Sequence, residues 1–289
     1  MRTRAVLLSG LMAVAIWATP GAQAPDWEVV VLGRAQDAGI PQLGCRQALC
    51  TSIREGRRAP EKVSSLGLVD RTTGRAYVFD ATPDFPAQVH ALTGGRVPDG
   101  IFLTHGHIGH YTGLMYLGRE SIGASRVPVY ATARMAGFLR DNGPWSQLVT
   151  LGNIALVPMT ADTAIPLPGG IRVTPFVVPH RDEFTDTVGF RVDGPRRSAV
   201  FIPDIDRWEK WDRDVRALAN DVDLLFVDGT FASPAEINRD LSEIPHPMMP
   251  ATRARLAGTR AALWFIHVNH TNAELDAPDV VREGQRFPL

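Results

Sequence analysis

Short apolar runs, rich in β-branched residues and bounded by turn-forming residues, recur along the chain from about residue 28. Turn signals separate several of them, for example Asp70-Arg71-Thr72-Thr73-Gly74, Pro168-Gly169-Gly170 and Asp193-Gly194-Pro195. Runs of this length and composition are typical of β-strands. The pattern predicts strands at residues 28–32, 65–69, 76–80, 100–103, 127–131, 154–159, 171–178, 187–192, 198–202, 223–227 and 262–266.

Helical periodicity occurs between these runs. It predicts helices at residues 83–92, 113–122, 133–142, 207–219 and 246–257. Within 207–219 the apolar residues Trp208, Trp211, Val215 and Leu218 are three or four apart, which is an amphipathic stripe that we expect to face the core. Strands interleaved with helices, with hairpins near both ends, predict an α/β or α+β fold with two sheets and helices outside them.

The N-terminus has the pattern of a secretory signal peptide. Arg2 and Arg4 precede an apolar stretch at residues 5–17, and residues 19–24 are small and turn-prone. We therefore expect cleavage near Ala24, a single domain at residues 25–289, and a periplasmic or secreted protein. The apolar run is short for a bilayer span and no later run is longer, so we expect no stable membrane insertion after cleavage. An uncut N-terminal anchor is the alternative.

Charge and cysteine content narrow the possible partners. Without the two arginines of residues 1–24 the chain has 28 basic and 31 acidic residues, a formal charge of −3. This net charge gives no sign of the excess of basic residues that nucleic-acid binding requires, so we expect a small-molecule substrate and no nucleic acid. The oligomeric state is left open. Cys45 and Cys50 alone cannot complete a zinc site, so they predict a local disulfide in an oxidising compartment, or free structural thiols.

The segment Thr104-His105-Gly106-His107-Ile108-Gly109-His110 follows a predicted buried strand and predicts a metal site. Imidazole is mostly neutral at pH 7 and is the commonest protein ligand of zinc and related metals. Packing alone does not explain three such rings so close together, because each would need its own hydrogen-bond partner. Since residues two apart in a strand point the same way, His105 and His107 can bind one ion, and His110 can face a second.

Further candidate ligands follow later strands at the point where each strand ends. These residues are His180, Asp204, Asp228 and His267. Their serial order, in the same register as the histidine motif, predicts a metal site at the edge where two sheets meet.

The histidine segment resembles the His-x-His-x-Asp-His signature of the metallo-β-lactamase-fold hydrolases, with Gly109 where that family usually has an aspartate. The resemblance implies a four-layer αββα sandwich of two mixed sheets with outer helices. It also implies that three histidines bind a first metal and that an aspartate bridges to a second metal bound by two more histidines. The first set is His105, His107 and His180; the bridge is Asp204; the second set is His110 and His267.

Gly109 removes a ligand that this family uses for the second metal. We therefore expect a strong first site and a weaker second one, completed by Asp228, Asp84 or water. We also expect the substitution Gly109→Asp to raise the occupancy of the second site.

Other segments are most similar to the pyrroloquinoline quinone biosynthesis protein B group. Among them are Gly39-Ile40-Pro41-Gln42, Asp80-Ala81-Thr82-Pro83-Asp84 and His267-Val268-Asn269-His270-Thr271-Asn272, and the likeness extends from about residue 28 to 276. The group has a third cysteine in its early loop, lacks histidines at the positions of His105 and His107, and is typically cytoplasmic. The chain is thus a divergent relative, and cofactor biosynthesis is not carried over to it.

These residues predict a hydrolase that uses a metal-activated water. A metal bound by neutral imidazoles lowers the pKa of bound water from about 15.7 toward about 7 and makes hydroxide available. We expect one or two zinc ions, with iron or manganese as alternatives, and a small-molecule ester, lactone, amide or phosphodiester as substrate. We assign catalytic roles to Asp204 and Asp228, and we expect Asp80 to orient a ligand histidine. The resemblance to related phosphodiesterases and tRNA-processing nucleases implies a catalytic role for His246 as well; an exposed turn histidine is the alternative.

Two other functions remain open at this stage. Histidines with a carboxylate and open positions also suit iron(II) and oxygen chemistry, as in an oxidative enzyme related to quinone cofactor biosynthesis. A catalytically silent metal-binding protein is the other alternative, which Gly109 supports. Asp37, in Ala35-Gln36-Asp37-Ala38-Gly39, either lines the cleft or is a simple turn residue.

Overall fold

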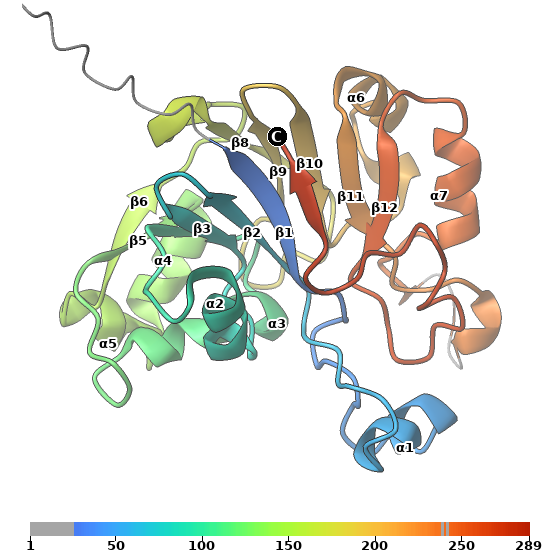
Figure 1. The fold of residues 1–289 in the computed structure, drawn as a ribbon, viewed down its shortest axis with the longest axis horizontal. Coiled ribbons are helices and arrows are strands. Elements are labelled where there is room, and N and C mark those ends of the chain that lie inside the picture. The colour runs from blue at the N-terminus through green and yellow to red at the C-terminus, as the bar shows by residue number, and fades with distance from the viewer. Residues whose placement is uncertain (1–25, 238–239, 241–242) are drawn as a thin grey trace, which may run out of the picture.

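The structure is a computed structural model that describes residues 26–237, 240 and 243–289. The described residues form two mixed β-sheets, which Figure 1 shows side by side with helices outside them. One sheet has the strand order β13-β1-β2-β3-β4-β5-β6 and the other β12-β11-β10-β9-β8-β7. The strands of the first sheet are β1 (Trp27–Gly33), β2 (Ser65–Asp70), β3 (Ala76–Phe79), β4 (Gly100–Phe102), β5 (Val127–Ala131), β6 (Ile154–Pro158) and β13 (Arg286–Pro288). Those of the second are β7 (Ile165–Pro166), β8 (Arg172–Val177), β9 (Val188–Asp193), β10 (Ser198–Ile202), β11 (Leu224–Asp228) and β12 (Ala262–Ile266).

Alternation along each strand divides the apolar side chains between two faces. In β1, Val29 and Val31 pack between the sheets, whereas Val30 and Leu32 pack against the outer helices. Aromatic rings from both sheets fill the central layer, where Phe79 lies 5.2 Å from Phe102 in its own sheet and 5.3 Å from Phe190 in the opposite sheet (ring centroids).

Helices cover both outer faces. The helices α2 (Phe85–Thr93), α4 (Ala133–Asp141) and α5 (Trp145–Thr150) pack on the first sheet, and α6 (Val215–Asp221) and α7 (Met249–Leu256) pack on the second (Figure 1). Two further helices are short, α1 (Ala48–Arg54) and α3 (Ile108–Tyr111). Figure 1 shows α1 projecting from the end of the sandwich to which β1 leads. The predicted four-layer αββα sandwich is confirmed.

Strand direction brings distant segments to one edge. In the first sheet β1, β3 and β4 run the same way, because β1 and β3 are both antiparallel to β2, while β4 is parallel to β3. In the second sheet β10, β11 and β12 are parallel, and β8 runs with them because both β8 and β10 are antiparallel to β9. Residues that follow these strands therefore gather at shared edges.

The predicted strands all occur, within about one residue at each end. Two short edge strands, β7 and β13, were not predicted, and neither were the helices α1, α3 and α5. These elements have two to seven residues, which is too short for a hydrophobic periodicity to be recognised in the sequence.

Two predicted helices were wrong in extent. Residues 207–219 form a 3₁₀ turn at Trp208–Lys210 and then helix α6, because Asp214 caps the helix by accepting a hydrogen bond from Arg216 N at 2.8 Å. The indole groups upstream are fixed by distant residues: Trp208 Nε1 donates to Thr252 Oγ1 and Trp211 Nε1 to Val177 O, each at 2.9 Å. Both indoles are buried, so the prediction that the stripe faces the core is confirmed.

The second of these is the helix predicted at residues 113–122. The segment is a 3₁₀ helix, Thr112–Leu117, that ends where Gly118 adopts an extended backbone. Leu114 and Leu117 are three residues apart and both fully buried, a spacing that suits the three-residue turn of a 3₁₀ helix.

The predicted disulfide between Cys45 and Cys50 is present. The signal peptide predicted at residues 1–24 lies outside the described residues and stays a prediction. Among the helices of the described part, none has the length and apolar character needed to cross a membrane.

Candidate metal centre

The site forms where chain segments leave the strands that share a direction. The histidine segment joins β4 to α3, and Asp80 follows β3 directly. Asp80 accepts hydrogen bonds from Thr104 N at 2.8 Å and from Thr104 Oγ1, which locks the start of the histidine segment to the neighbouring strand. Asp80 and His267 both have left-handed backbones, with φ of 67° and 62°. Such conformations are costly for residues other than glycine and cluster at functional sites.

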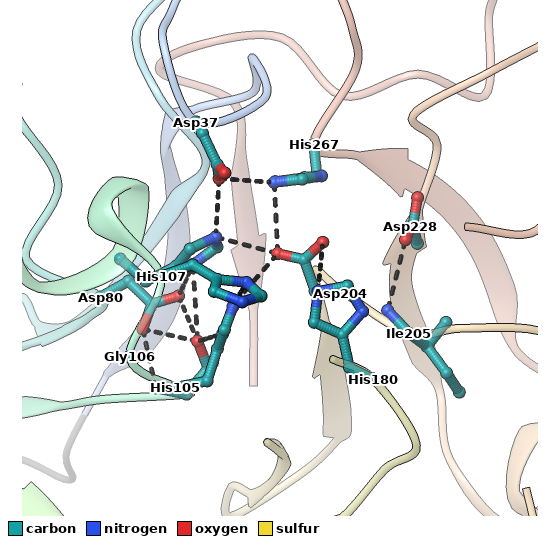
Figure 2. A network of polar contacts seen from close by, with 12 residues as sticks. Asp37, Asp80, His105, Gly106, His107, His180, Asp204, Ile205, Asp228 and His267 are labelled. Atoms are coloured by element: carbon teal, nitrogen blue, oxygen red, sulfur yellow. Dashed lines mark hydrogen bonds and ion pairs between the residues drawn. The ribbon is translucent and has the colours of Figure 1, made fainter. Parts of the chain in front are cut away.

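A first group of ligand atoms comes from three histidines. His105 Nε2 lies 2.8 Å from His107 Nδ1, and the ring of His180 lies 5.3 Å and 5.1 Å from those two rings (Figure 2). One nitrogen from each lies within 4.8 Å of the others. The structure thus brings together the three histidines assigned to the first metal.

A second group contains His110, His267, Asp204 and one further residue, Asp37. Asp204 Oδ2 lies 2.9 Å from His110 Nε2 and 3.2 Å from His267 Nε2. Asp37 Oδ1 lies 3.1 Å and 3.2 Å from the same two nitrogens. Figure 2 shows Asp37 and Asp204 each joined to His267 by a dashed line.

Asp204 lies between the two groups. Its Oδ1 is 3.8 Å from His180 Nε2, whereas its Oδ2 contacts His110 and His267 and lies 3.8 Å from His105 Nε2. The residue is 3 % exposed, so the carboxylate has little water to solvate it. One carboxylate thus faces both sets of imidazoles.

Asp228 and His246 form a connected pair beside the second group. His246 Nδ1 lies 2.7 Å from Asp228 Oδ2, and Asp228 Oδ1 accepts hydrogen bonds from Thr230 N and Thr230 Oγ1 at 2.9 and 2.7 Å. Atoms of Asp204, Asp228, His246 and His267 also lie within 4.8 Å of one another. His246 lines a cavity of about 770 Å³ together with Trp208.

Hydrogen bonds from outside the ligand groups fix how the rings face. His110 Nδ1 lies 2.7 Å from Asp80 Oδ2, His267 Nδ1 lies 3.1 Å from Thr230 Oγ1, and His107 Nε2 lies 3.0 Å from Glu183 Oε2. Metal-binding histidines characteristically use their second nitrogen in this way. The expected orienting role of Asp80 fits this contact.

Burial and charge shift the pKa values of the site in two directions. Burial lowers the pKa of His105 well below its usual value and, with His246 and His107 adding to the effect, that of His180 to about 4. Burial acts the same way on His110, but the carboxylates of Asp80, Asp204 and Asp37 outweigh it and raise its pKa well above the usual value. His105 and His180 of the first group are therefore neutral imidazoles, whereas the charge of His110 in the second group is balanced by carboxylates.

Most of the predicted site residues lie in these groups. One expectation was wrong. Asp84 accepts a hydrogen bond from Val63 N at 2.8 Å and belongs to none of the ligand groups of the described residues, so it does not complete the second group. Asp37 occupies that place; because the search for ligands considered only later strands, it missed the segment that follows β1, four residues beyond Gly33. Asp37 is more than a simple turn residue, because it contacts His110 Nε2 and His267 Nε2.

The domain described as the beta-lactamase superfamily domain matches residues 75–268, more than half of the chain. This chain belongs to that superfamily and has the metallo-β-lactamase fold. A protein of Ruegeria pomeroyi named coenzyme PQQ synthesis protein B is 28% identical over 275 residues, which cover 85% of this chain and 90% of that protein.

Solved structures share the fold. The zinc-bound PqqB of Methylobacterium extorquens superposes with a TM-score of 0.76 at 23% identity, over 91% of this chain and 100% of that chain. A diphosphatase of the PhnP family superposes with a TM-score of 0.69 at 23% identity, over 91% and 97%. The short form of human tRNase Z superposes with 0.60 at 18%, over 90% and 98%. The predicted resemblance to PqqB-like proteins is confirmed, and members of the superfamily with this fold include hydrolases.

Proposed function

We propose that this protein is a metal-dependent hydrolase with two adjacent metal positions and a small-molecule ester, lactone, amide or phosphodiester as substrate. The observation that carries the proposal is the position of Asp204, whose two oxygens face two different groups of buried imidazoles. Superfamily membership and the fold shared with a diphosphatase and a tRNase support it.

The nitrogen and oxygen atoms of these two groups are suitable ligands for metal ions. Three imidazole nitrogens suit zinc, and two imidazoles with carboxylates suit zinc, iron or manganese. Among the described residues, the buried Nδ1 of His180 has no hydrogen-bond partner in the protein. Buried polar atoms rarely stay unpaired, so this atom favours a further group in the site.

We assign the first ion to His105, His107 and His180, and the second to His110 and His267, with Asp204 between them. Ions held there would acidify water and polarise the bond under attack. The protein's own part is to fix the rings through Asp80, Thr230 and Glu183, and to keep bulk water away from ligands that are almost fully buried.

His246 supplies the proton-transfer group in this proposal. Asp228 accepts the hydrogen bond from His246 Nδ1 and so leaves Nε2 as the nitrogen that exchanges a proton with the leaving group. Asp228 is itself fixed by Thr230 and by Ile205 N, which donates to it at 3.3 Å. The cavity lined by His246 has the volume of a small-molecule site.

The test is elemental analysis of protein purified without added metal or tag histidines, followed by assays of the zinc-loaded protein on ester, lactone, amide and phosphodiester panels. About two zinc ions per chain with turnover of one class supports the proposal. A protein that binds no metal, or a zinc-loaded protein inactive on every panel, contradicts it.

An iron-dependent oxidative enzyme is the second candidate. It is favoured by the similarity to proteins named coenzyme PQQ synthesis protein B and by the His110, His267 and carboxylate set, which suits iron(II). Oxygen uptake by iron-loaded protein with an organic substrate, and none of the hydrolytic activities, would select it over the hydrolase.

Single replacements of first-group histidines test the assignment directly. We expect His105→Ala and His180→Ala each to lose one metal ion per chain together with activity. His90→Ala is the matched control, because His90 lies on the exposed face of α2 and should change neither quantity. Full metal content in both site variants would disprove the assignment.

A further inference from the structure

Gly109 lies directly against Asp37. A Cβ atom added at Gly109 would lie 2.5 Å from Asp37 Oδ1, 2.7 Å from its Cα and 2.9 Å from its Cβ. Real Cβ atoms do not approach other atoms this closely. The space that a side chain at position 109 would fill is therefore already filled by Asp37.

Backbone conformation does not explain the glycine. Gly109 lies inside α3 and is absent from the glycines of the described chain that have a positive φ. Glycine in a helix costs about 1 kcal/mol relative to alanine, so its presence needs another reason. The reason that the structure offers is room for Asp37.

The chemistry of Asp37 matches the carboxylate that is missing from position 109. Its Oδ1 lies 3.1 Å from His110 Nε2 and 3.2 Å from His267 Nε2, and one atom of each of these residues and of Asp204 lies within 4.8 Å of the others.

We propose that Asp37 is a ligand of the second metal ion and that it supplies, from the loop after β1, the carboxylate that the superfamily signature carries at the position of Gly109. This inference rests on the proposed metal-dependent function. It makes a side chain at 109 and the carboxylate at 37 mutually exclusive. The expectation that Gly109→Asp alone would raise occupancy of the second site is thereby reversed.

The experiment measures zinc stoichiometry and affinity by elemental analysis and calorimetry on stripped protein. We expect two zinc ions for the wild type and one for Asp37→Ala, with the second affinity lower by about 10–100-fold or more, the loss that even outer partners of a metal cause. Asp141→Ala is the matched control, since Asp141 is an exposed carboxylate at the end of α4. The retained first zinc shows that the variant is folded.

Substitutions at the glycine complete the test. Gly109→Ala should also lose the second zinc, because its methyl group displaces Asp37. Gly137→Ala is its control: this helical glycine has only Arg140 and Asp141 side-chain atoms near, at 3.7 and 4.0 Å, and its substitution should leave both zinc ions bound. The double variant Asp37→Gly/Gly109→Asp, which returns the carboxylate to position 109, should regain the second zinc.

The outcomes separate the two proposals. Two zinc ions in the wild type and two of unchanged affinity in Asp37→Ala would overturn the role of Asp37 and leave the metal-dependent function standing. A double variant that binds no more zinc than Asp37→Ala would overturn the exchange of positions. A wild type that binds no zinc would overturn the proposed function as well.

Discussion

Single atoms decide the chemistry of this site, because both histidines of the second group are fixed through their second nitrogens. Asp80 fixes His110, and Thr230 fixes His267. The same rule applies to His246, which donates its Nδ1–H to Asp228, so only its Nε2 remains for chemistry. The close contact of the His246 ring with Asp204, at 3.5 Å, leaves one alternative, that His246 is itself a ligand.

Replacing His246 distinguishes these roles. We expect His246→Ala to lower kcat by about 10²–10⁴-fold, the usual contribution of a positioned acid or base, with metal content unchanged. A pH profile of kcat that loses one limb in the variant would identify the proton-transfer group. Loss of a metal ion from His246→Ala would show instead that the ring is a ligand; His90→Ala again serves as the control.

At the scale of elements, the segment after β1 is held in place by a buried arginine. Arg34 donates to Glu61 Oε1 and Oε2 at 2.7 and 2.8 Å, and to the carbonyl oxygens of Leu275 and Val281 at 2.9 and 3.0 Å. The side chain of Arg34 is 4 % exposed. Arg34 lies three residues before Asp37, and its network joins the end of β1 to the C-terminal segment. The network therefore positions the loop that carries the proposed ligand.

Breaking the ion pair between Arg34 and Glu61 should destabilise the fold in a pH-dependent way. We expect Glu61→Gln to lower the free energy of unfolding by about 3 kcal/mol at pH 7, since it leaves a buried cation with a weaker partner. Burial would raise the pKa of Glu61, but Arg34 outweighs it and holds the pKa below 4.5. Because the pKa of Glu61 is lower in the folded state, its ionised form stabilises the fold at any pH above its pKa in the unfolded chain. This stabilisation is lost as the pH falls through the pKa in the folded state, so the stability difference between wild type and Glu61→Gln should shrink below about pH 4.5.

Denaturant unfolding at pH 7 and pH 3.5 measures this difference. Glu120→Gln is the control, because the side chain of Glu120 is 74 % exposed and its ion pair with Arg119 should contribute about 0–1 kcal/mol. A Glu61→Gln variant as stable as this control at pH 7 would contradict the role assigned to the Arg34 network.

For the whole molecule, the candidate metal centre joins the two halves of the sandwich. The histidine segment and Asp37 follow strands of the first sheet, whereas His180, Asp204 and His267 follow strands of the second. Bound ions would thus link the sheets at one edge, in addition to the apolar layer between them.

Metal removal should therefore lower the melting temperature. Binding to the folded state alone stabilises it by about 2.7 kcal/mol at a free metal concentration of 100 times Kd. For a domain of this size that corresponds to a shift of about 5–10 °C. Thermal unfolding before and after chelation, and again after zinc is returned, measures the shift; a midpoint that does not move despite complete metal removal would contradict the linkage.

The strands and the first metal group could be predicted from the sequence because their signals are local. The continuous apolar runs of β1 and β4 directly indicate strands that are buried on both faces. His105 and His107 are close enough in sequence to bind the same ion. His180, Asp204 and His267 were found because each follows a strong strand pattern within a few residues. The short elements β7, β13 and α1 carried too little periodicity to be found.

Contacts between distant segments were decided by the tertiary structure alone. In the segment predicted as one helix at 207–219, the indoles of Trp208 and Trp211 donate to Thr252 and Val177, which lie far away in sequence. The place of Asp37 depends on β1 running in the same direction as β4, which brings its loop against α3. A sequence pattern shows that position 109 lacks a carboxylate. Only the packing of the loop after β1 against α3 shows that Asp37, 72 residues away in sequence, fills its space, because that contact is fixed by strand order and not by local periodicity.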